Sequence, residues 1–145
     1  MARPSSNLIQ ASRQACTRQW WDAGCSDFEL FTSQETLDEA GRGELAMAKE
    51  RLEMLEKAGI LEITAEVADL TRMLLRKEII PVKAASDAVH IAVASVHRMD
   101  FIVTWNFKHI ANPHIRTRLR DAVAAFGSDL PVICTPEELL NDEND

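Results

Sequence analysis

Residues Ala84 to Ile110 read AASDAVHIAVASVHRMDFIVTWNFKHI, and the predicted fold is built around this stretch. Its first half, Ala84 to His97, is apolar on nearly every face, which is typical of a helix buried in a core. Phe101 to Trp105 is a short β-branched and aromatic run, typical of a buried strand. Asp87 puts a carboxylate in the first turn of the helix. The helix dipole stabilises such an acid by only about 0.3–1 kcal/mol, and burying an unpaired charge costs much more. Asp87 therefore needs a cation, a network of donors or a metal.

The composition indicates one ordinary globular domain that covers residues 1–145. Of these residues 46% are hydrophobic and 27% are charged, as in average soluble domains. No run approaches the roughly 18 apolar residues of a membrane span, and the beginning, MARPSSNLIQ, lacks the apolar segment of a signal peptide. Cys16, Cys25 and Cys134 show no paired spacing, which favours reduced thiols. We expect a cytoplasmic protein with no membrane association.

The charge is unevenly distributed. A net charge of −7 does not indicate general affinity for nucleic acid. The segment Lys108 to Arg120 nevertheless carries four Lys or Arg residues and two histidines, and its first acid comes only at Asp121. This basic strip is either a solvated helix face or a surface that meets phosphates, and the sequence favours neither.

Strands that alternate with helices predict an α/β fold with a mostly parallel sheet. The expected strands are Phe28–Thr32, Ile60–Ile63, Phe101–Trp105 and Pro131–Thr135. The expected helices include Asn7–Ala23, Glu44–Lys57, Ala65–Lys77, Ala84–His97 and Pro113–Phe126. A short helix that carries Glu35, Asp38 and Glu39 follows the first of these strands, because TSQE matches a capping box with Thr32 as N-cap and Glu35 at N3.

Three side chains are expected at the carboxyl ends of the strands, where open α/β sheets bind ligands. These are Glu39, Asp87 and Asn106, whose oxygens suit Mg²⁺ or Mn²⁺. Their spacing is not decisive, because three such residues occur in any acidic protein.

Each candidate also has a simpler explanation. Asp87 could cap its own helix through Ser86 and the first-turn amides. Glu39 could belong to a solvated acidic face. His90, three residues after Asp87, is better explained as a core histidine than as a ligand.

Three segments resemble PIN-domain proteins, the group that contains the VapC-like toxins. The segment SDAVHIAVASVHRMDFIVTWNFKHIAN resembles the C-terminal half of that family, with an Asp that opens an apolar helix and a short strand that ends in Thr, any residue, and Asp or Asn. In SQETLDEAGRGE, Ser33 begins a helix and leads to Glu39, as in the family's second motif. PVICTPEELL resembles the end of a bacterial subgroup. The resemblance extends from Arg3 over nearly the whole chain.

The resemblance implies a three-layer α/β/α sandwich and a Mg²⁺- or Mn²⁺-dependent endoribonuclease, the toxin of a toxin–antitoxin pair. Glu39 and Asp87 match two of the family's metal-binding acids, and Asn106 stands where many members have another. Thr104 matches a hydroxyl on the same strand end, and with Lys108 it is expected to contact the substrate. The implied partners are RNA, an antitoxin protein and a second copy in a homodimer. The alternative is a catalytically inactive PIN-like module that binds RNA or protein without cleavage.

The beginning of the chain departs from the family. Members open with a strand in the pattern apolar-apolar-Asp/Glu-Thr-Ser, which carries the first acid. Here no acid precedes Asp22, and MARPSSN shows no apolar strand. We therefore expect an N-terminally truncated sheet that lacks a central strand and one metal ligand. A shifted start, a degenerate member, or another segment or subunit in the gap would each account for this.

Overall fold

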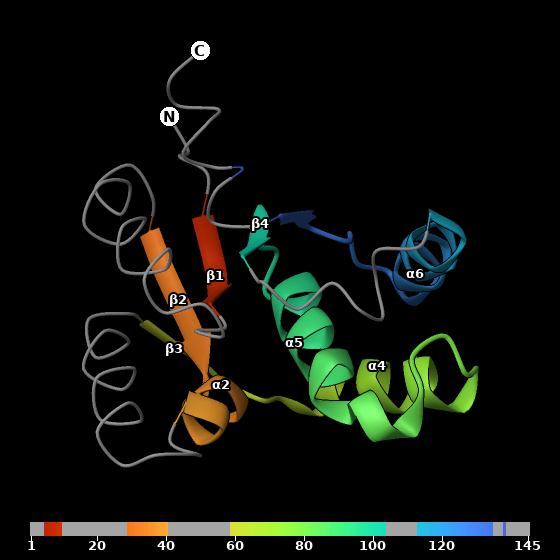
Figure 1. Cartoon of the computed structure of the whole chain (residues 1–145), viewed down its shortest axis with the longest axis horizontal. Coiled ribbons are helices and arrows are strands. Elements are labelled where there is room, and N and C mark those ends of the chain that lie inside the picture. The colour runs from red at the N-terminus through yellow and green to blue at the C-terminus, as the bar shows by residue number, and fades with distance from the viewer. Residues whose placement is uncertain (1–4, 10–28, 41–58, 104–112, 135–137, 139–145) are drawn as a thin grey trace.

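The computed structural model describes residues 5–9, 29–40, 59–103, 113–134 and 138. For residues 5–9, 29, 30, 36, 39, 40 and 113 it describes the backbone alone. The expected helix Glu44–Lys57 and most of Asn7–Ala23 lie outside these ranges. Within them, helices and strands are interspersed along the chain (Figure 1).

The described strands form a five-stranded sheet in the order β3-β2-β1-β4-β5. They are β1 (Ser5–Ile9), β2 (Glu29–Ser33), β3 (Gly59–Leu61), β4 (Phe101–Val103) and β5 (Val132–Cys134). Each neighbouring pair is parallel. This confirms the predicted mixed α/β fold with parallel strands.

Strand β1 corrects the expectation that the central strand is missing. It pairs with β2 on one side, where Ser5 lies opposite Glu29, and with β4 on the other, where Ile9 lies opposite Val103. The register with β4 shifts between Ser6 and Ile9. The helix expected from Asn7 is therefore wrong over its first residues. Because β1 has partners on both sides, non-local pairing outweighs the helical spacing of its apolar residues.

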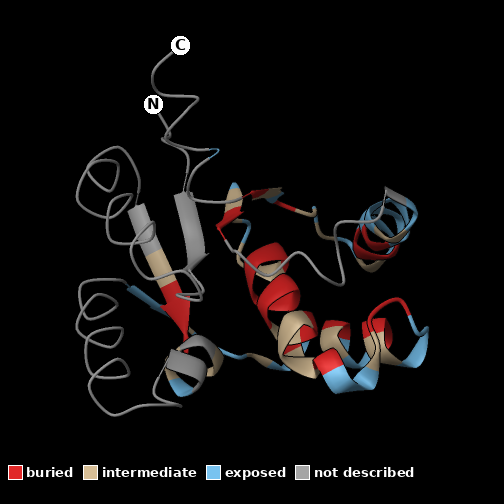
Figure 2. Cartoon of the chain, viewed as in Figure 1, coloured by how far each residue is buried: buried red, intermediate tan, exposed pale blue. Residues whose placement is uncertain are grey.

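The core is formed mainly by buried side chains of helices α4 (Ala65–Arg76), α5 (Ala85–Val96) and α6 (Pro113–Phe126), with Ile102 of β4 packed among them. Helix α5 packs against α4 and contacts β1 and β4. Figure 2 shows α5 buried over most of its length, as its apolar sequence predicts. Its second half, Ile91 to Ser95, is buried without interruption. The largest fully buried side chains include Leu70, Leu74, Ile80, Val93 and Leu119.

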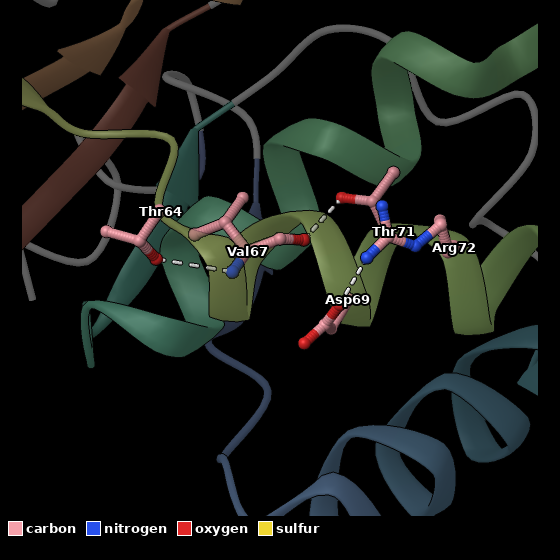
Figure 3. Close-up of polar contacts among 5 residues, drawn as sticks. All are labelled: Thr64, Val67, Asp69, Thr71 and Arg72. Atoms are coloured by element: carbon pink, nitrogen blue, oxygen red, sulfur yellow. Dashed lines mark hydrogen bonds and ion pairs between the residues drawn. The ribbon is translucent and has the colours of Figure 1, made fainter.

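Helix α4 begins with a side-chain cap from Thr64 (Figure 3). The Thr64 hydroxyl accepts a hydrogen bond of 3.3 Å from the Val67 backbone N–H. One turn on, the Thr71 hydroxyl donates to the Val67 carbonyl at 2.8 Å, and Arg72 pairs with Asp69 at the surface. The cap satisfies one of the free amides of the first turn, so the local sequence alone sets this helix start.

Helices α4 and α5 end in the same way. The residue after each C-cap, Glu78 and Arg98, has a left-handed φ of 56° and 57°. The following amide then bonds back to the helix: Ile79 to the Leu74 carbonyl at 3.1 Å, and Met99 to the Ala94 carbonyl at 2.9 Å. These are Schellman ends. Both use a non-glycine residue where glycine is favoured.

Most predicted bounds agree with the structure within one or two residues. Helix α6 spans the predicted Pro113–Phe126, and α5 is one residue shorter at each end. Helix α2 (Gln34–Ala40) begins directly after β2. Thr32 therefore lies in the strand and is not the N-cap of α2, which corrects the predicted capping box. Among the described helices, none is long and apolar enough to cross a bilayer.

Candidate functional site

The topology defines one edge of the sheet as the place for a site. The chain leaves β1 for β2 and β3 on one side of it, and returns to β4 and β5 on the other. The reversal falls between β1 and β4, and ligands of open α/β sheets bind outside the carboxyl ends at such a point. Helix α2 begins where β2 ends. Helix α5 leads to the amino end of β4, so its own beginning lies at the carboxyl edge. The arrowheads of β1 and β2 point toward α2 in Figure 1.

A hydrogen bond joins the beginnings of α2 and α5 at this edge. The Ser86 hydroxyl, in the first turn of α5, donates to Glu35 Oε1, in the first turn of α2, at 2.5 Å. Both side chains are half-buried. The N-cap of α5 is Ala84, which makes no side-chain cap bond, so a carboxylate from α2 stands near the positive end of α5.

Asp87 follows Ser86 in the first turn of α5 and is half-buried. The hydroxyl of Ser86 is directed to Glu35 and does not cap its own helix. The structure therefore brings two carboxylate-bearing helix starts together, with Glu35 bonded to the residue beside Asp87. Both acids lie at the positive end of α5, where a negative charge is stabilised.

The acids of α2 divide between an inner and an outer position. Asp38 is exposed and accepts a hydrogen bond of 2.9 Å from the Gln34 side chain, so it belongs to the solvated face. Glu35 is the acid directed to α5. Glu39 lies in the last turn of α2, four residues after Glu35 and so on the same helix face. Its side chain is outside the part of the chain that the structure describes.

The other expected site residues follow β4. Thr104, Asn106 and Lys108 lie outside the described residues, and β4 ends at Val103, immediately before Thr104. Within the described ranges there is no group of three His, Cys, Asp or Glu side chains suited to a metal. Of the expected metal ligands Glu39, Asp87 and Asn106, Asp87 is thus the one whose side chain lies within the described part of the chain.

Two further side chains bear on the site. His90 is only 3% exposed, which agrees with its interpretation as a core histidine. Thr32 is fully buried near the carboxyl end of β2, and its hydroxyl has no hydrogen-bond partner among the described residues. Ser33 is the last residue of β2 and directly precedes α2. The helix that was expected to begin at Ser33 therefore begins one residue later.

A hollow of about 420 Å³ lies at the opposite edge of the sheet. It is lined by the turn between α5 and β4, including Arg98 and Asp100, and by the loop before β5, including Ser128 and Asp129. These residues precede β4 and β5, so the hollow faces the amino ends of the strands. It does not belong to the site of Glu35 and Asp87.

Sequence reasoning missed Glu35 and Ser86 as neighbours, because no local pattern reveals a contact between residues 51 positions apart. It also missed a signal at β1. With the strand at Ser5–Ile9, the sequence Leu8-Ile9-Gln10-Ala11-Ser12 can be aligned with the pattern apolar-apolar-acid-Thr-Ser, but Gln10 stands in place of the acid and Ala11 in place of the Thr. Gln10 itself is outside the described residues.

No protein-family model and no curated protein sequence matches this chain. The case for a function therefore depends on the parallel sheet, on the two joined helix starts at its carboxyl edge, and on the resemblance of the sequence segments.

Proposed function

We propose that the chain is a PIN-type, metal-dependent endoribonuclease, the toxin of a toxin–antitoxin pair, and that its fold is the three-layer α/β/α sandwich of that family. The observation that carries the proposal is the hydrogen bond from Ser86 to Glu35, which holds the starts of α2 and α5 together at the carboxyl edge of a parallel sheet. The resemblance to PIN-domain proteins implies that acids from these two helices lie at that edge.

In this proposal Asp87 and Glu39 hold Mg²⁺ or Mn²⁺, with Asn106 as a neutral oxygen ligand. The donor set fits, because all these oxygens are hard ligands. A divalent ion bound there would supply an activated water and charge stabilisation for phosphodiester cleavage. Ser86 fixes Glu35 beside the metal-binding acids, and Thr104 and Lys108 contact the RNA. An antitoxin and a second copy of the chain are the proposed protein partners.

The second candidate is an inactive PIN-like module that binds RNA or protein without cleavage. It is favoured by Gln10, because an amide stands where the family pattern has its first acid. An amide oxygen carries no net charge and binds a divalent cation more weakly than a carboxylate does. If the chain is instead a nuclease, its metal site should be weak, and replacing Gln10 with an acid should strengthen metal binding.

The test is RNA cleavage by the purified chain with Mn²⁺, beside two variants that change the charge of the site. Asp87→Asn should abolish cleavage. Gln10→Asp should raise the rate about tenfold or lower the Mn²⁺ concentration required, because it restores a carboxylate. Asp38→Asn, which changes an exposed acid on α2, is the matched control and should leave the rate unchanged.

Two results would separate the candidates. Cleavage that survives Asp87→Asn would reject the proposed site. The absence of cleavage in the parent chain and in Gln10→Asp, with RNA binding retained, would favour the inactive module.

A further inference from the structure

A short turn that carries an exposed cation precedes helix α5. This turn, η2 (Val82–Ala84), is a 3-10 helix, and α5 begins directly after it at Ala85. Val82 is 75% exposed, more than any other large apolar side chain that the structure describes, and Lys83 is exposed beside it. The turn therefore faces solvent next to the first turn of α5, which holds Ser86.

The backbone of η2 is fixed by two hydrogen bonds. The Ala84 N–H donates to the Pro81 carbonyl at 2.8 Å, and the Ala85 N–H donates to the Val82 carbonyl. Pro81 has a φ of −66°, the value to which its ring restricts it. Lys83 is thus carried by a hydrogen-bonded turn, so a ligand that binds to it has only the lysine side chain to order.

Lys83 is close to the candidate site by chain length alone. It precedes Ser86 by three residues, so the two Cα atoms are at most about 11 Å apart, and the helical turns between them shorten this distance. The Ser86 hydroxyl is bonded to Glu35 at the carboxyl edge of the sheet. That edge is assigned from α5 and from the described turn into β4. A ligand held at Asp87, one residue after Ser86, is therefore within reach of the Lys83 ammonium group.

The fold itself does not account for the charge of Lys83. A cation before the first turn of a helix is disfavoured by the helix dipole. Within the described ranges Lys83 makes no hydrogen bond or ion pair, and the nearby Glu35 carboxylate accepts its hydrogen bond from Ser86. A cation without a structural task among the described residues thus stands at the rim of the proposed site.

We propose that Lys83 binds a phosphate of single-stranded RNA next to the phosphate that is cleaved, an inference that rests on the proposed action on RNA. The carboxylates of the site, on a chain that carries −7, repel a polyanion unless positive charge is placed locally. A divalent ion would supply that charge at the cleaved phosphate, and Lys83 supplies it at a neighbouring one. The ammonium group is a compact point charge, so the contact is independent of base sequence and dependent on salt.

The experiment first measures binding of a fluorescent 20-nucleotide oligouridine to the full chain in EDTA, over a series of salt concentrations. Lys83→Gln should weaken binding about fivefold and reduce the salt slope by about 0.7, the value of one phosphate contact on a single strand. Lys83→Arg should retain most of the binding, because it keeps the charge. Arg98→Gln is the matched control and should change affinity by less than about twofold. Arg98 is exposed at the other end of the 12-residue helix α5, about 18 Å away along its axis.

Cleavage in Mn²⁺ then separates substrate binding from a structural role. Lys83→Gln should raise KM about fivefold and leave kcat within about twofold, because it removes binding that substrate and transition state share. If Lys83 instead only neutralises the acids of the site, Lys83→Gln should leave KM unchanged and lower the Mn²⁺ concentration required, because a repelling cation is removed. That result would overturn the proposal.

An equal loss of RNA binding in Arg98→Gln would also overturn the proposal, because net charge alone would then explain the effect. So would the absence of RNA binding by the parent chain. Weaker binding by Lys83→Gln in EDTA, with no cleavage by the parent chain in Mn²⁺, would contradict the nuclease function and support this inference. Cleavage with a KM that Lys83→Gln does not change would contradict this inference and support the nuclease function.

Discussion

The contact between Ser86 and Glu35 is the residue-scale feature on which the candidate site depends. It joins residues that are 51 positions apart, and it does so in a half-buried place where a carboxylate needs donors. Ala84, the N-cap of α5, makes no side-chain cap bond. Glu35, a residue of α2, therefore places a carboxylate at the N-terminal end of α5. Its hydrogen bond to Ser86 fixes the position of α2 relative to α5.

Ser86→Ala should lower the free energy of unfolding by about 1–2 kcal/mol, because a hydrogen bond to a charged group in a half-buried place is lost. Gln34→Ala removes an exposed bond to Asp38 and should cost less than about 0.5 kcal/mol. Urea denaturation measures both. A double-mutant cycle with Glu35→Ala should give a coupling of at least about 0.5 kcal/mol, and a coupling near zero would mean that the contact does not hold the helices.

At the scale of elements, the sequence predicted helices better than strands. Pro113 and Gly127 bracket α6, and Thr64 caps α4, so local chemistry sets these bounds. Strand β1 has no comparable local signal: SSNLI carries two apolar residues, Leu8 and Ile9, that also fit the spacing of a helix. Its pairing on both sides decides its conformation, and such pairing is invisible in a linear pattern.

The left-handed helix ends give a prediction of their own. Arg98→Gly and Glu78→Gly should each raise the free energy of unfolding by about 0.5–1 kcal/mol, because a left-handed conformation costs other L-residues about 1–2 kcal/mol and the entropy of glycine returns part of this. Thermal or urea unfolding measures the change. Arg120→Gly, inside α6, is the matched control and should instead cost about 1 kcal/mol.

The opposite substitution, from glycine to alanine, can be tested at the end of α6. Gly127 has a φ of 101°, and a Cβ there would meet no atom within 4 Å. Gly127→Ala should therefore cost about 1 kcal/mol from the backbone conformation alone. Destabilisation by glycine at both Glu78 and Arg98 would contradict the described helix ends.

At the scale of the whole molecule, the fold class was readable from the sequence and the site only in part. Alternating elements predicted the parallel α/β arrangement, and Asp87 was singled out as a candidate because a carboxylate interrupts an apolar helix. The contact of Glu35 with α5 was not predicted, since Glu35, Asp38 and Glu39 look alike in sequence and only the packing of α2 on α5 distinguishes them. Gln10 can be aligned with the first acid of the family pattern only once β1 is known to end at Ile9.

We propose that the carboxyl edge of the sheet holds a divalent cation through Asp87 and Glu39. The most direct test is the unfolding temperature of the chain with and without Mn²⁺. A ligand that binds the folded state alone stabilises it by about 2.7 kcal/mol at a hundred times its dissociation constant. We predict that Mn²⁺ raises the unfolding temperature of the parent chain and of Asp38→Asn, but not that of Asp87→Asn or Glu39→Gln. Equal shifts in all four proteins, or no shift in the parent chain, would contradict the claim.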